Sequence, residues 1–93
     1  MEQRRRFIVR GTVQGVGFRD YVMKRGRLLG LTGWVRNLPD GRTVEAVAQG
    51  DGPSLEAFAE DFMRGPRGAR VTEFQAQPEP ADAKLNGPFA IKK

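Results

Sequence analysis

The segment that ends at Arg19 has the residue types and spacing of a phosphate site. It reads Gln14, Gly15, Val16, Gly17 and Phe18, and it lies between a β-rich run and a helical pattern. A glycine-rich turn at a helix N-terminus gathers backbone N–H groups at the positive end of the helix dipole, which suits an anion. The guanidinium of Arg19 adds a group that can hold two phosphate oxygens at once. We therefore expect this segment to bind a phosphate group.

The position of Arg19 supports a functional role over that of a solvated surface charge. Cations are favoured at the C-terminal end of a helix, so an arginine at the start of one opposes the dipole. Gly15 and Gly17 suit both a tight turn and an anion cradle, and these two roles are compatible.

Several kinds of catalytic chemistry are excluded by the residue types that the chain lacks. It contains no His and no Cys, which excludes Ser-His-Asp triads, Cys-His dyads and typical zinc sites. Its single serine, Ser54, lies at an expected helix start, where capping explains it. An enzyme of this composition would work by positioning and charge, as in phosphoryl transfer to water. An acyl phosphate suits such a site because its carboxylate leaving group needs no general acid.

Composition indicates one small globular domain over residues 1–93 with anionic partners. The chain is 39% hydrophobic and carries a net charge of +5, which suits a small phosphorylated molecule or nucleic acid. Its arginine clusters have no interleaved aromatic residues, so base stacking is not indicated. No apolar run is long enough for a membrane span or a signal peptide. Because cysteine is absent, we expect a reducing, cytoplasmic setting.

Periodicity and turn residues predict a ferredoxin-like α+β fold. Strands are expected over residues 7–13, 33–37, 42–49 and 69–77, helices over residues 18–29 and from Gly52 to the Gly65-Pro66 stop, and a short edge strand over residues 89–91 after a loop at 78–88. The order βαββαβ plus a C-terminal strand predicts an antiparallel sheet with two helices on one face. Trp34, Phe58 and Phe62 are expected in the core, and Gly26 is interpreted as a close-packing position.

Two segments closely resemble the signatures of the acylphosphatase family. They are Val13-Gln14-Gly15-Val16-Gly17-Phe18-Arg19 and Gly30-Leu31-Thr32-Gly33-Trp34-Val35-Arg36-Asn37. The similarity continues through Asp40-Gly41, Val44-Glu45, Ala48-Gln49-Gly50, Gly65-Pro66 and Phe89-x-Ile91, and so covers essentially the whole chain. The resemblance implies a small standalone enzyme that hydrolyses acyl phosphates to a carboxylate and inorganic phosphate.

The resemblance also implies the roles of individual residues. Arg19 would bind the phosphate together with backbone amides of residues 14–18, and Asn37 would orient the attacking water. Taken alone, Asn37 at a strand-to-turn junction suits a turn residue. The resemblance implies no metal and no organic cofactor, and we expect a monomer whose partner is the small-molecule substrate.

Two alternatives remain open. A nucleic-acid-binding module on the same fold would suit the sequence pI of about 10.4, but the expected strand 42–49 lacks the aromatic residues that such modules expose. The second alternative is an acylphosphatase-like regulatory or carbamoyl-phosphate-processing domain, as occurs within larger maturation proteins. We favour a standalone enzyme over it, because the chain stops at Lys93 without zinc-finger cysteines.

Overall fold

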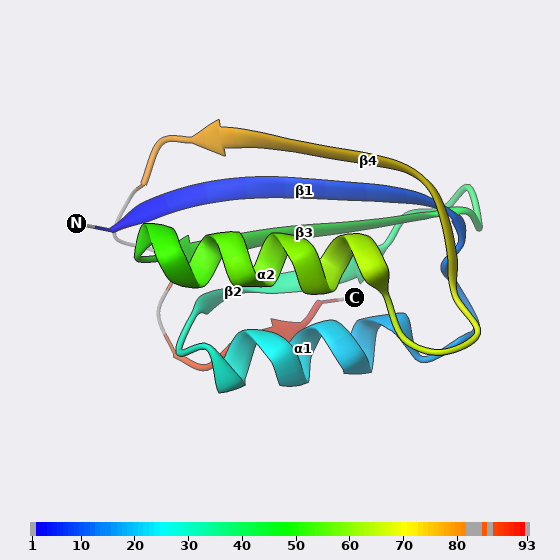
Figure 1. Ribbon diagram of the computed structural model, residues 1–93, viewed down its shortest axis with the longest axis horizontal. Coiled ribbons are helices and arrows are strands. Elements are labelled where there is room, and N and C mark those ends of the chain that lie inside the picture. The colour runs from blue at the N-terminus through cyan, green and yellow to red at the C-terminus, as the bar shows by residue number, and fades with distance from the viewer. Residues whose placement is uncertain (1, 82–84, 86, 93) are drawn as a thin grey trace.

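The computed structural model describes residues 2–81, 85 and 87–92 of the chain (Figure 1). The elements are β1 (Gln3–Thr12), α1 (Phe18–Leu28), β2 (Thr32–Asn37), β3 (Thr43–Gly50), α2 (Gly52–Arg64), β4 (Arg70–Glu79) and β5 (Ala90–Ile91). Each expected element is present. The largest shift is in β1, which begins four residues earlier than expected. Residues 82–84 and 86 of the expected loop at 78–88 lie outside the described part.

The sheet has the strand order β4-β1-β3-β2-β5. β1 pairs with β3 and β4, and β2 pairs with β3, all antiparallel, whereas β5 runs parallel to β2. Figure 1 shows both helices side by side over one face of this sheet. The expected ferredoxin-like α+β architecture with a short C-terminal strand is confirmed, and the direction of β5 makes the sheet mixed.

The core between the sheet and the helices is built largely from phenylalanine rings. Phe58 of α2 lies 5.3 Å from Phe7 of β1 and 5.4 Å from Phe89, centroid to centroid, and Phe62 lies 5.6 Å from Phe18. All five rings are at most 2% exposed. Burial of a side chain of this size stabilises the fold by about 1.5–3 kcal/mol. The expected core positions Phe58 and Phe62 are confirmed.

The expectation that Trp34 lies in the core is wrong. Side chains alternate between the two faces of a strand, and its neighbour Val35 is fully buried beneath the helices. Trp34 therefore lies on the open face of the sheet. There the Lys92 ammonium stands 4.5 Å and the Arg36 guanidinium 5.2 Å from the ring centroid.

Ion pairs connect four strands across the open face. The buried carboxylate of Glu45 on β3 accepts hydrogen bonds from Arg36 Nε on β2, at 2.7 Å, and from Arg6 on β1. Arg6 Nε also donates to Glu79 on β4, at 2.8 Å. Much of the positive charge of this face is thus neutralised within the protein.

The N-terminus of α2 is capped by Asp51 and not, as expected, by Ser54. The Asp51 carboxylate accepts a hydrogen bond from the Ser54 backbone N–H at 2.7 Å. Asp51 precedes the first helical residue, where a side-chain oxygen reaches the free N–H groups of the first turn. The expected stop at Gly65, which has a φ of +71°, is confirmed.

Candidate active site

The loop between β1 and α1 is shaped by two glycines in the left-handed region. Gly15 has a φ of +75° and Gly17, which precedes the first residue of α1, has a φ of +77°. A Cβ at either position would meet no heavy atom within 4 Å. The backbone conformation, rather than a lack of space, therefore favours glycine at both positions. The buried ring of Phe18 anchors the end of the loop in the core.

This loop presents a run of backbone donors that are unpaired within the described part of the chain. Among the described residues, none accepts a hydrogen bond from the backbone N–H groups of residues 15–19. The first N–H groups of a helix have no partner within the helix, and they carry the positive end of its dipole. The loop therefore offers consecutive donors to an anion at the N-terminus of α1.

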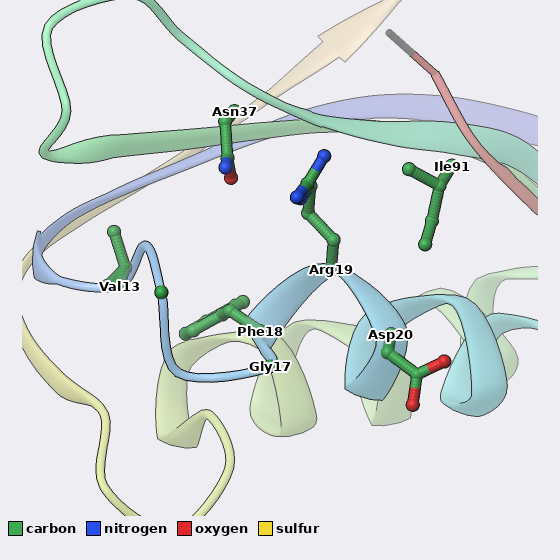
Figure 2. A pocket seen from close by; sticks show the side chains of 8 residues that line it. Val13, Gly17, Phe18, Arg19, Asp20, Asn37 and Ile91 are labelled. Carbon is green, nitrogen blue, oxygen red and sulfur yellow. The ribbon is translucent and has the colours of Figure 1, made fainter.

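Arg19 places its guanidinium above this helix start, without a partner among the residues that the structure describes. Figure 2 shows its side chain extending from α1 into the space between Asn37 and Ile91. It makes no ion pair or side-chain hydrogen bond with any residue that the structure describes. Other arginines of α1 are engaged: Arg25 pairs with Asp61 and Arg27 donates to a backbone carbonyl. Arg19 is thus available to an external anion.

The acidic neighbour of Arg19 does not neutralise it. The Asp20 carboxylate points away from the guanidinium in Figure 2 and pairs with Lys24 at 3.0 Å, one turn along α1. The positive charge of Arg19 therefore faces the cavity uncompensated by its own helix.

Asn37, at the end of β2, brings an unsatisfied acceptor to the same place. Its side chain points toward Arg19 and the loop (Figure 2). Its Oδ1 is buried and, within the described part of the chain, has no hydrogen-bond partner. An unsatisfied buried polar atom costs about 1–3 kcal/mol. Such an atom points to a partner supplied from outside the protein, such as water or substrate.

These groups surround one cavity of about 220 Å³. Its lining residues are Val13, Gly15, Gly17, Phe18, Arg19, Asp20, Asn37 and Ile91. The structure thus brings Gly15, Gly17, Phe18, Arg19 and Asn37, all predicted site residues, together at one cavity. Gln14 and Val16 lie in the same loop but do not line the cavity.

Sequence reasoning did not assign Ile91 to the site. It comes from the C-terminal strand β5, and 38% of its surface is exposed beside the cavity. The alternating pattern of Phe89-Ala90-Ile91 predicted a strand but not its neighbour in the sheet. The pairing of Ile91 with Val35 of β2 places this strand beside the site.

The turn that follows Asn37 is closed by Asp40. Its carboxylate accepts hydrogen bonds from Thr43 Oγ1 and from the backbone N–H of Arg42. The hydrogen bond from Thr43, followed by that from Arg42, holds the pKa of Asp40 below its ordinary value. These hydrogen bonds close the turn from within, directly after the end of β2.

The described part of the chain has neither a metal-binding cluster of acidic side chains nor a membrane-spanning helix. Its acidic side chains form no cluster of three that could hold a metal ion. None of its helices is long and apolar enough to cross a membrane.

Comparison with known proteins identifies the family. Residues 5–91 match the family model described as Acylphosphatase. An acylphosphatase of Aeropyrum pernix is 48% identical over 89 residues, covering 96% of this chain and 87% of that relative. The crystal structure of acylphosphatase from Bacillus subtilis matches with a TM-score of 0.90 and 35% identity over 100% of both chains. Full-length HypF in its phosphate- and nucleotide-bound form matches with a TM-score of 0.83 and 29% identity, over 12% of that chain. The resemblance seen in the two sequence segments is confirmed, and the chain belongs to the acylphosphatase family.

Proposed function

We propose that this chain hydrolyses acyl phosphates to a carboxylate and inorganic phosphate in the cavity between Arg19 and Asn37. One observation carries the proposal. Backbone donors, a guanidinium and a buried oxygen that have no partner among the described residues all meet at this cavity. The backbone N–H groups and the guanidinium can donate to negatively charged phosphoryl oxygens, and the Asn37 oxygen can accept a hydrogen bond from water. Membership of the acylphosphatase family supports the same reaction.

Arg19 and the amides of residues 14–18 hold the phosphoryl group in this proposal. The guanidinium can donate to two phosphoryl oxygens at once, and the loop amides can donate to the others. The loop amides are fixed by the fold before the substrate arrives. They therefore stabilise the charge that develops in the transition state without reorganising, and one such donor is commonly worth about 10²–10³ in rate.

Asn37 orients the attacking water. Its Oδ1 accepts one hydrogen of the water, which turns a lone pair of the water oxygen toward phosphorus. A bond forms between this oxygen and phosphorus while the bond from phosphorus to the acyl oxygen breaks. The carboxylate leaves with the electron pair, and the proton of the water passes to a phosphoryl oxygen of the substrate. A carboxylic acid has a pKa of about 4 in water. The carboxylate is therefore stable as an anion at neutral pH, and its departure needs no acid from the protein.

We further infer that the chain acts as a single-domain monomer in the cytoplasm, without a metal or organic cofactor. Arg19 and Asn37 line the same cavity of one chain, so both proposed ligands can act within a single copy. Arg19 and the loop amides supply the positive charge that a metal would otherwise bring. The absence of cysteine is compatible with a reducing compartment.

The nucleic-acid alternative receives less support. On the open sheet face Glu45 and Glu79 engage Arg6, and Lys92 and Arg36 lie against the Trp34 ring. Cations that are already paired, and an aromatic ring already flanked by cations, are a poor platform for stacked bases. Because an acylphosphatase-like domain that processes carbamoyl phosphate remains an open alternative, an assay should include carbamoyl phosphate among the substrates.

The proposal is tested by the substrate range of the purified protein. Benzoyl, acetyl and carbamoyl phosphate should be compared with p-nitrophenyl phosphate, an ester whose leaving group is not a carboxylate, with and without excess EDTA. We expect hydrolysis of the acyl phosphates, little hydrolysis of the ester, and no effect of EDTA. A protein that leaves benzoyl and acetyl phosphate intact would contradict the proposal. Hydrolysis of carbamoyl phosphate alone would instead favour the carbamoyl-phosphate alternative.

A further inference from the structure

We propose that Gln14 is a positioning residue whose side chain sets the phosphate loop against the turn that carries Asn37. The inference rests on the proposed function and deepens it. It assigns to Gln14 a role in alignment, separate from any contact of its backbone amide with phosphate.

The Gln14 carboxamide connects the loop to both strands of a hairpin. Its Nε2 donates to the carbonyl oxygens of Leu38 and Thr43, each at 2.9 Å. Leu38 directly follows Asn37 at the end of β2, and Thr43 begins β3. A carboxamide nitrogen has two hydrogens, so both donors of Gln14 are engaged away from the cavity.

The hairpin is closed without help from Gln14. Leu38 N donates to the carbonyl of Thr43 at 2.9 Å, and the Asp40 carboxylate accepts from Arg42 and Thr43. β2 and β3 also pair along their length, from Thr32 with Gln49 to Asn37 with Val44. Removal of the Gln14 donors should therefore leave the hairpin folded and release only its connection to the loop.

This connection joins the two halves of the site. The loop amides and Arg19 belong to one continuous segment, whereas Asn37 belongs to another element of the fold. In the part of the chain that the structure describes, no other hydrogen bond joins residues 13–17 to residues 37–43. A shift of the loop would move the bound phosphoryl group relative to the water, and a misplacement of about 1 Å can cost about 10²-fold in rate.

The expected signature is therefore a loss of turnover without a loss of phosphate binding. The phosphate ligands would move together with the loop and keep their own geometry. The distance from phosphorus to the water on Asn37 would change, and kcat depends on this distance.

The test compares Gln14→Met, which has a similar length but no donor, with Gln14→Glu, whose oxygens would face two carbonyls. Gln75→Met, at an exposed position of β4, is the matched control. The readouts are kcat and KM for benzoyl phosphate, competitive inhibition by inorganic phosphate, and the unfolding midpoint. We expect kcat to fall about tenfold or more in Gln14→Met and further in Gln14→Glu, with unchanged inhibition by phosphate, whereas Gln75→Met behaves as the wild type.

A double-mutant cycle with Asn37→Ala separates alignment from general stability. If Gln14 acts by aligning the phosphoryl group with the water on Asn37, Gln14→Met should cost little once Asn37 is removed. An equal loss in both backgrounds would overturn the inference. So would wild-type kcat in Gln14→Met, or equal losses of kcat and phosphate binding.

The two proposals fail in different ways. A wild-type protein without activity on acyl phosphates would remove the proposed function and this inference together. An active wild type, an impaired Asn37→Ala and a normal Gln14→Met would remove only the role of Gln14.

Discussion

The ring of Phe89 packs directly against the backbone of Gly26 in α1. A Cβ at residue 26 would stand 2.6 Å from Cγ of that ring, and both residues are buried. Arg27 Nε also donates to the carbonyl oxygen of Phe89 at 2.7 Å. These contacts hold the chain just before β5 against α1, and β5 brings Ile91 to the cavity. The interpretation of Gly26 as a close-packing residue is thus confirmed.

Replacement of this glycine should destabilise the protein although alanine is the better helix former. Gly→Ala in a helix interior normally stabilises by about 1 kcal/mol, whereas overpacking of a core typically costs about 1–3 kcal/mol. Because the clashing atoms include Cβ and Cγ of Phe89, which lie next to its backbone, and the residue is fully buried, we predict a net loss of stability for Gly26→Ala in urea unfolding. In a Phe89→Leu background the penalty should shrink. A Gly26→Ala variant more stable than the wild type would contradict this reading.

Substitution of Gly17 should depend on whether the new residue accepts a left-handed backbone. A Cβ there meets nothing, so the cost comes from the conformation alone, about 1–2 kcal/mol for most residues. Asparagine visits this region more readily than alanine. We therefore predict that Gly17→Asn keeps more affinity for inorganic phosphate than Gly17→Ala, as measured by competitive inhibition. The reverse order would show that the backbone conformation does not control the loop.

Acidification should remove a stabilising contribution of Asp40. Its pKa is held below the ordinary value by hydrogen bonds from Thr43 and Arg42. A carboxyl group whose pKa is lowered in the folded state stabilises the fold above its unfolded-state pKa, and this contribution is lost as the pH falls through the folded-state pKa. The stability difference between the wild type and Asp40→Asn should therefore be largest near neutral pH and shrink below about pH 4. A difference independent of pH would contradict the prediction.

The sequence predicted those parts of the fold that have local signals. Gly17 and Gly65 mark helix boundaries, and the strand patterns predicted all five strands apart from their ends. The prediction for Trp34 was wrong because Trp34 and Val35 are both apolar and point to opposite faces of the strand. The pattern therefore does not show which of the two faces is buried. Ser54 and Asp51 are both favoured cap residues and lie three residues apart at the start of α2. The sequence alone does not show which of them caps the helix. The direction of β5 has no local signal, since alternation is the same in parallel and antiparallel strands.

The candidate site was predictable where it is continuous in sequence and less so where it is assembled by the fold. Residues 14–19 follow one another, and their glycines indicated an anion site directly. Asn37 alone suited a turn, and only the family resemblance implied a catalytic role for it. The Gln14 side chain finds its partners 24 and 29 residues away, and Ile91 reaches the cavity from the other end of the chain. Contacts of this kind depend on strand register and sheet order, which local patterns do not specify.

The central claim divides the site into a phosphate ligand, Arg19, and a water ligand, Asn37. It is tested most directly by measuring benzoyl phosphate hydrolysis and inhibition by inorganic phosphate in folded Arg19→Ala and Asn37→Ala variants side by side. We predict that Asn37→Ala loses about 10²-fold or more in kcat but binds phosphate as the wild type does, and that Arg19→Ala loses both phosphate binding and turnover. Near-normal turnover in both variants, or normal phosphate binding in Arg19→Ala, would contradict it.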